Sequence, residues 1–346
     1  MMPPDTSTTR LRQIARAAVV TNVLIVVTGG AVRLTGSGLG CPEWPTCTAG
    51  SLVPVANAEV AGLHQAIEFG NRLLSFVVLA VAVMALLAAL RQSPRRADVV
   101  RLAALLPVGV MAQGVVGGVI VLTGLHPLIV AAHFLVSIAV IAAAVTLDHR
   151  VRHGDRPAQV LVSDPLRTLQ RLLLVVVATV LTLGTLVTAS GPHAGDAATP
   201  RLGLDPRLIS QFHADGVFLL LGLTAALWFA LRATGAPLVT QRATTVLLGV
   251  SLAQGTIGYV QYFTGLPEVL VGAHLLGACL VWIAALHVWL APARNVRRHA
   301  NGGHPIRNDR RSSDLPQGLG SLPAPGDRPQ TEDPEQASED RAEHRR

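Results

Sequence analysis

Residues 112–133 read AQGVVGGVIVLTGLHPLIVAAH, and residues 253–274 read AQGTIGYVQYFTGLPEVLVGAH. The two stretches share Ala-Gln-Gly, Thr-Gly-Leu and Ala-His, and each shared segment lies 141 residues from its counterpart without a gap. Apolar helices can resemble one another through composition alone. Here the shared residues include a glutamine and a histidine, which composition does not explain. The register therefore predicts that the chain consists of two related halves.

Apolar residues surround this repeat in long blocks. They make up 50% of the 346 residues, whereas charged residues make up only 14%. Soluble domains carry roughly 25% charged residues, so an ordinary soluble globule is excluded. A helix needs about 20 apolar residues to cross the hydrocarbon core, and open sheet edges cannot be satisfied in lipid. Eight windows meet this requirement, at 15–34, 63–90, 102–122, 128–147, 169–189, 208–231, 243–263 and 268–291.

The predicted fold class is an all-α polytopic membrane protein, with eight transmembrane helices arranged as two pseudo-symmetric four-helix bundles. Because four spans is an even number, the halves share one orientation, as parallel repeats do. A final segment with few apolar residues is predicted to be disordered. The predicted divisions are a cytoplasmic N-terminus at 1–14, an N-terminal half at 15–147, a cytoplasmic linker at 148–168, a C-terminal half at 169–292 and a cytoplasmic tail at 293–346.

The formal net charge of +7 comes from a chain whose basic residues are all arginine. Most arginines lie in the termini and alternate loops, while the opposite side holds only Arg33, Arg201 and Arg207. By the positive-inside rule, we expect both termini to be cytoplasmic. The expected location is the cell (plasma) membrane, as a multi-pass protein. The charge thus reflects topology, and no nucleic-acid partner is expected.

Four histidines, His64, His133, His213 and His274, lie near the starts of the even-numbered windows. Those helices begin on the outer side, so all four side chains lie within about two turns of one face. Polar residues inside spans are costly and by default mark function. A single histidine inside a span would more simply form a hydrogen bond to a neighbouring helix. A zinc site is less favoured, because the halves lack the additional Cys or carboxylate ligands that usually complete one. Paired imidazoles on facing helices favour axial ligation of haem iron.

A carboxylate accompanies the first histidine. Glu68 lies four residues after His64 and three before Asn71, so the three share one helix face. A buried carboxylate is costly unless it is neutralised or paired, and Arg72 is the nearest candidate partner. We favour a role for Glu68 in handling a proton or stabilising a cation over a purely structural ion pair with Arg72.

The first outer loop contains Cys41 and Cys47, within GCPEWPTC at 40–47. On the oxidising side, two nearby cysteines can form a disulfide or remain a thiol pair. Covalent haem attachment through Cys-x-x-Cys-His does not fit this spacing. Cys279 is interpreted as a small core residue. His126 and His193, in outer loops, are candidates for contact with haem propionates.

Three stretches, GGAVRLTGSGLGCPEWPTC at 29–47, IEFGNR at 67–72 and SGPHAGD at 190–196, resemble the haem A synthase family. The similarity covers residues 15–292. The resemblance implies two four-helix halves, with a haem b cofactor in the C-terminal half and the haem O substrate in the N-terminal half.

The same resemblance implies ligands. His213 and His274 would ligate haem b, and His133 would ligate the substrate haem. Glu68 would match a glutamate important for activity, and Cys41 with Cys47 the outer-loop cysteine pair. The family commonly has Glu-x-x-His-Arg in the second span, whereas this chain has Asn71 followed by Arg72. His64, two turns earlier on the same face, is one alternative ligand; otherwise His133 alone would hold the substrate iron.

The implied reaction is stepwise oxidation of the C8 methyl of haem O, through the alcohol, to the formyl group of haem A for cytochrome oxidase biogenesis. Expected partners are haem O, haem O synthase, an electron carrier and membrane lipid, with a homo-oligomer left open. The alternatives are a non-catalytic haem-binding assembly protein, a bis-His membrane cytochrome b and a transporter. A transporter would place its site at the membrane midplane, unlike these histidines.

Overall fold

The structure is a computed structural model that describes residues 6–48, 50–55, 62–153, 159–160, 162–291 and 293–294. Apart from its first two residues, the tail predicted to be disordered at 293–346 lies outside the described residues.

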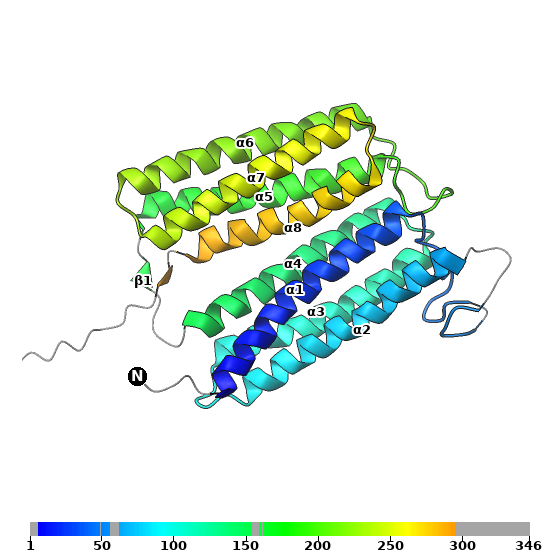
Figure 1. The fold of residues 1–346 in the computed structure, drawn as a ribbon, viewed down its shortest axis with the longest axis horizontal. Coiled ribbons are helices and arrows are strands. Elements are labelled where there is room, and N and C mark those ends of the chain that lie inside the picture. The colour runs from blue at the N-terminus through cyan, green and yellow to red at the C-terminus, as the bar shows by residue number, and fades with distance from the viewer. Residues whose placement is uncertain are drawn as a thin grey trace, which may run out of the picture. The chain divides into compact units, whose positions relative to one another are not determined.

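Eight long helices make up nearly all of the described chain (Figure 1). Each is long and apolar enough to cross a membrane, which confirms the predicted all-α class and the eight spans. A short antiparallel ribbon joins β1 (Gln159–Val160) to β2 (Ala293–Arg294). The helices are α1 (Thr6–Leu34), α2 (Gly62–Leu90), α3 (Ala97–Leu122), α4 (Pro127–His153), α5 (Asp164–Ser190), α6 (Pro206–Ala233), α7 (Leu238–Phe263) and α8 (Glu268–Leu290).

Several helices extend beyond the apolar windows. The linker predicted at 148–168 is shorter in the structure, because α4 continues to His153 and α5 begins at Asp164. The apolar window marks only the hydrocarbon core, whereas a helix can continue through the headgroup region on either side. Helix ends therefore carry polar residues that hydropathy alone assigns to loops.

The repeat is visible in the backbone. Helices α3 and α7 begin and end 141 residues apart, and so do the first residues of α4 and α8. Helices α3 and α7 are both followed by the same left-handed turn. The φ angle is positive at Gly124 and Leu125 after α3, and at Gly265 and Leu266 after α7. Glycine adopts this conformation without strain and commonly terminates helices. The shared Thr-Gly-Leu sequence is therefore a shared helix-terminating turn.

The helices pack as two four-helix bundles, α1–α4 and α5–α8 (Figure 1). The halves meet through α1 with α8, α4 with α8 and α4 with α5. This pattern maps onto itself when each helix is exchanged for its counterpart in the other half. The loops before α2, α4, α6 and α8 lie together at one end of the bundles, at the right of Figure 1. We call this the histidine end, and the other the opposite end.

Small residues allow the first two helices to pack closely. Ala82, Ala85 and Ala89 of α2 and Ala15 and Ala18 of α1 are all buried and belong to one apolar cluster. Lipid chains are as apolar as leucine, so close van der Waals packing rather than escape from water stabilises helix pairs in a membrane. This packing sets the rotation of each helix and hence which side chains face one another at the histidine end.

Candidate functional site

The C-terminal half brings two of the predicted ligands face to face. The ring centroids of His213 on α6 and His274 on α8 lie 6.3 Å apart, with an interplanar angle of 68°. A metal ion bonded about 2 Å from one nitrogen of each ring requires a centroid separation of about 6 Å. The two rings are therefore spaced to accept a metal ion between them.

Hydrogen bonding fixes the tautomer of His213. Its Nδ1 lies 3.0 Å from the carbonyl oxygen of Val180 on α5. A carbonyl can only accept, so Nδ1 carries the proton and Nε2 keeps its lone pair. Metal-ligating histidines almost always donate their other ring N–H to such a group, which orients the ring. His213 thus has the supporting hydrogen bond of a metal ligand.

Glycines make room for both rings. A β-carbon built at Gly184 on α5 would lie 3.2 Å from Cε1 of His213, and one at Gly258 on α7 would lie 3.1 Å from Cε1 of His274. Both distances are tighter than ordinary contacts. Each imidazole therefore occupies space that any larger residue on the preceding helix would restrict.

The N-terminal half repeats half of this arrangement. His133 on α4 faces Gly117 on α3, where a β-carbon would lie 3.8 Å from Cε1. Gln113 donates to the backbone oxygen of His133 at 2.9 Å, just as Gln254 donates to that of His274 at 2.7 Å. The repeated glutamine thus ties each odd-numbered helix to its partner at the level of the histidine. His133 and His274 are structurally equivalent.

Asn71 faces the first helix. A β-carbon at Gly29 on α1 would lie 3.9 Å from Nδ2 of Asn71, and the hydroxyl of Thr28 lies 2.8 Å from Oδ1. In the C-terminal half the corresponding side chain, opposite Gly184, is His213. Asn71 therefore occupies the place on α2 that His213 occupies on α6.

His64 lies closer to the end of the helix. Its Nδ1 is 2.8 Å from the hydroxyl of Ser37, and its backbone oxygen lies where a β-carbon of Gly40 would be. These contacts connect the start of α2 to the loop that follows α1. In this structure His64 is a contact residue of that loop.

Buried Glu68 and half-buried Arg72 form an ion pair that holds the cysteine loop. Oε1 of Glu68 lies 2.7 Å from the guanidinium of Arg72, and Oε2 accepts from the backbone N–H of Cys41 at 2.7 Å. Arg72 also donates to the backbone oxygens of Cys41, Glu43 and Thr46, at 2.8, 3.0 and 2.9 Å. Both carboxylate oxygens of Glu68 and the guanidinium of Arg72 therefore have hydrogen-bond partners, as charges removed from water require.

The loop itself is closed by a disulfide between Cys41 and Cys47. Trp44, at its tip, packs over Gly118 of α3, where a β-carbon would meet the indole ring. Gly118 is the neighbour of Gly117, which faces His133. The disulfide loop thus spans from α2 to α3 beside the histidine of the N-terminal half.

The remaining predicted residues lie outside these clusters. His193 contacts the backbone oxygen of Leu266 through Nε2 at 3.0 Å, and its own backbone oxygen accepts from Nε of Arg33. His126 is exposed, and Cys279 is buried in α8. In the described chain, no group of three or more His, Cys, Asp and Glu side chains could hold a metal ion. The histidine pair therefore suits a metal that brings its other ligands with it, as haem iron does.

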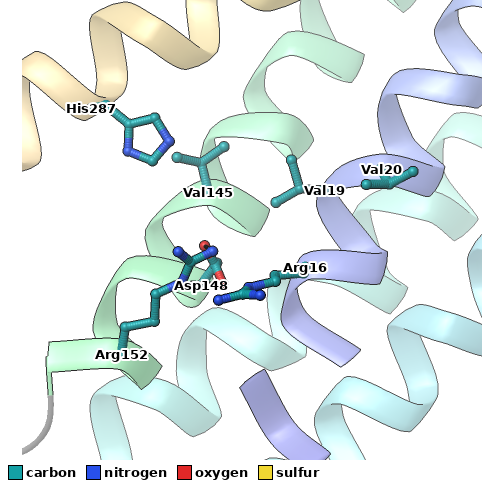
Figure 2. Close-up of a pocket in the computed structure, with 7 residues that line it drawn as sticks. All are labelled: Arg16, Val19, Val20, Val145, Asp148, Arg152 and His287. Atoms are coloured by element: carbon teal, nitrogen blue, oxygen red, sulfur yellow. Dashed lines mark hydrogen bonds and ion pairs between the residues drawn. The ribbon is translucent and has the colours of Figure 1, made fainter. Parts of the chain in front are cut away.

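A cavity of about 230 Å³ lies at the opposite end (Figure 2). Val19 and Val145 line it, and the Arg16, Asp148 and Arg152 side chains point toward one another there. Asp148 is buried and pairs with Arg152, whose Nε lies 2.9 Å from Oδ1. On α8 the cavity residue His287 lies thirteen residues beyond His274, roughly 20 Å along the helix. This cavity is separate from the histidine site.

The four glycines opposite the side chains of the site are not among the residues predicted from the sequence. A signal was present, because Gly117 and Gly258 lie 141 residues apart, in the register of the repeat. The anchoring of the cysteine loop by Glu68 is not predicted either: Arg72 is the candidate partner of Glu68, but a structural pair is the less favoured of the two interpretations. The backbone groups that complete this anchor leave no pattern in the sequence.

Fold and site together define a polytopic membrane protein of two repeated four-helix halves, with a histidine pair at one end of the second. The family model described as cytochrome oxidase assembly protein matches residues 12–203, which is more than half of the chain. The chain belongs to this family, and the resemblance found in the sequence is confirmed.

Curated relatives carry a more specific name. A haem A synthase of Lysinibacillus sphaericus (strain C3-41) is 35% identical over 148 residues, which cover 42% of this chain and 46% of the relative. A haem A synthase of Geobacillus thermodenitrificans is 31% identical over 141 residues, covering 40% of this chain and 43% of the relative. The chain thus matches less than half the length of these relatives.

Proposed function

We propose that this protein is a haem A synthase, an oxidoreductase that converts the C8 methyl of haem O to the formyl group of haem A. The observation that carries the proposal is a ligand-spaced histidine pair, His213 and His274, in a chain of this family. With water as the source of the oxygen atom, the methyl group becomes the alcohol with loss of two electrons and two protons, and the alcohol becomes the formyl group with loss of two more of each. The protein therefore requires an external electron carrier, and haem O synthase is the natural supplier of its substrate.

The C-terminal half is the proposed cofactor site. His213 and His274 would hold the iron of haem b, with the proton of His213 kept on Nδ1 by Val180. When bound, the haem supplies the electron chemistry, while the protein sets ligation and orientation. Gly184 and Gly258 give the two rings the space to take up this orientation.

The N-terminal half is the proposed substrate site. Its His133 is equivalent to His274, with the same glycine opposite the ring and the same glutamine on the backbone oxygen. His133 would bind the iron of haem O and thereby fix where the C8 methyl lies. The disulfide loop, which reaches α3 through Trp44, would restrict access of water from the histidine end.

Glu68 is the proposed catalytic group of this half, assisting proton removal or stabilising positive charge at the methyl. Its contacts with Arg72 and Cys41 support a second role, in positioning the loop. We expect Glu68→Gln to abolish formyl formation while haem stays bound, since glutamine keeps the shape but loses the charge. Exposed Glu268, at the start of α8, provides the control variant Glu268→Gln. Unchanged haem A yield in Glu68→Gln would remove the catalytic role.

The arginine distribution supports a plasma-membrane protein with both termini in the cytoplasm and the histidine end outside. Under this orientation Cys41 and Cys47 lie on the oxidising side, consistent with their disulfide. Reporter fusions at the loops after α2 and α3 would test it. The first loop should report the cytoplasm and the second the outer side; the reverse result would overturn the orientation.

Pigment extraction tests the proposed function directly. The full chain, purified from cells that make haem O, should contain haem b together with haem O, its alcohol or haem A, identified by mass. Cells that express the chain should accumulate haem A, and cells that express His133→Ala should not. If the chain binds haem but never converts haem O, the protein is instead a non-catalytic haem-binding assembly protein.

A further inference from the structure

Four places in the fold are equivalent, and three of them carry histidine. Each lies on an even-numbered helix opposite a glycine, which stands five or six residues before the end of the preceding odd-numbered helix. The pairs are Gly29 with Asn71, Gly117 with His133, Gly184 with His213, and Gly258 with His274. The fold thus provides four ligand positions, and the one on α2 holds an amide in place of an imidazole.

The Asn71 side chain is not an equivalent ligand. Imidazole is a good ligand for iron, whereas carbonyl oxygens suit harder cations. The carbonyl oxygen of Asn71 is also engaged, because the hydroxyl of Thr28 lies 2.8 Å from Oδ1. The amide is therefore in contact with α1 through its oxygen.

His64 does not take the place of Asn71. It lies seven residues earlier on α2, roughly 10 Å nearer the end of the helix. Ser37 engages its ring at 2.8 Å, and the close approach of Gly40 to its backbone fixes this end of α2 against the loop. His64 is therefore not one of the four positions that face a glycine near the end of the preceding odd-numbered helix.

We infer that an iron bound in the N-terminal half receives one imidazole from this chain, from His133, and that its other axial side faces Asn71 and is open to a small ligand. The iron of the C-terminal half receives two imidazoles, from His213 and His274. This inference rests on the proposed function, because it requires haem in both halves. The two repeats then differ in coordination: one iron is six-coordinate, and the other can accept a ligand from solution.

Spin state tests the inference independently of turnover. The full chain is purified with its haems, the haem-to-protein ratio is measured, and optical and electron paramagnetic resonance spectra are recorded. We expect two haems per chain, one low-spin and one high-spin. Asn71→His should convert the high-spin haem to low-spin, whereas the matched variant Asn71→Gln should not. His64→Ala should leave the wild-type spectra unchanged.

Added imidazole gives a measurement that needs no variant. It should bind one haem per chain of the wild-type protein and convert it to low-spin. Two low-spin haems in the wild type, with one lost in His64→Ala, would overturn the inference while the proposed function stood. Two haems that both resist imidazole would also overturn it. A ratio of one haem per chain would instead overturn the two-haem function, and the inference with it.

Discussion

The indole Nε1 of Trp282 on α8 donates a hydrogen bond to the backbone oxygen of Ile138 on α4, at 2.9 Å. Both residues are buried, and the bond joins the two halves at the contact between α4 and α8, which are counterparts in the repeat. Because the contact is buried, water does not compete for this hydrogen bond.

Trp282→Phe should therefore destabilise the protein, because it leaves the Ile138 oxygen with one acceptor site unfilled. Loss of such a partner costs about 1–3 kcal/mol. The measurement is the free energy of unfolding of the full chain in detergent. Trp228→Phe is the control, since its indole donates to the exposed hydroxyl of Thr245. If the two variants lost the same free energy of unfolding, the hydrogen bond between the halves would contribute no more to stability than the exposed one.

Gly258→Ala should weaken haem binding in the C-terminal half. The added methyl would lie 3.1 Å from Cε1 of His274 and would push the ring from its position. Overpacking of this kind costs about 1–3 kcal/mol. Haem content per chain is the readout. Gly117→Ala, where the methyl would lie 3.8 Å from His133, should have little effect, and an equal loss there would contradict the explanation.

His213→Ala should remove the low-spin haem while leaving the other haem bound. The ring of His213 is one of the two spaced at 6.3 Å, and its removal takes away one axial ligand and the contact with Val180. Haem content should fall by about half, because one of the two proposed haem sites, one in each four-helix half, is lost. His153→Ala, at the exposed last residue of α4 at the opposite end, is the control. Retention of the low-spin signal in His213→Ala would exclude this ligand.

Arg72→Ala should release the cysteine loop. Arg72 donates to three loop carbonyl oxygens and neutralises Glu68, so its loss leaves the buried carboxylate without its cationic partner. Breaking a buried pair from one side costs about 3–5 kcal/mol. Reduction of the disulfide by a thiol, followed by alkylation, should be faster than in the wild type. Arg207→Ala, an exposed residue at the same end, should leave that rate unchanged.

Asp148→Asn should destabilise the opposite end of the protein. Asp148 is buried beside Arg152 and Arg16 at the cavity in Figure 2, so the variant removes the negative charge that pairs with Arg152 and that Arg16 points toward. The matched variant is Asp98→Asn, whose carboxylate is 47% exposed in its pair with Arg96. Exposed pairs contribute about 0–1 kcal/mol. The temperature of thermal unfolding should therefore be lowered by Asp148→Asn much more than by Asp98→Asn.

Much of this architecture could be predicted from the order of the residues along the chain. Hydropathy depends on local composition, so it placed all eight helices, and the 141-residue register predicted two related halves, which share the turns at Gly124 and Gly265. Helix ends were less well predicted, as at His153, because the apolar window stops before the helix does. The candidate site was predicted in part: His213 and His274 lie together.

The sequence by itself determined the membrane class, the two-half organisation and the place of each histidine near the start of its helix, because these follow from residue type and position along single helices. Only the tertiary structure decided that Asn71 lies in the place equivalent to His213 and that His64 contacts Ser37. It also decided that Glu68 holds the cysteine loop. These outcomes depend on the rotation of each helix about its axis, and packing against neighbouring helices sets that rotation.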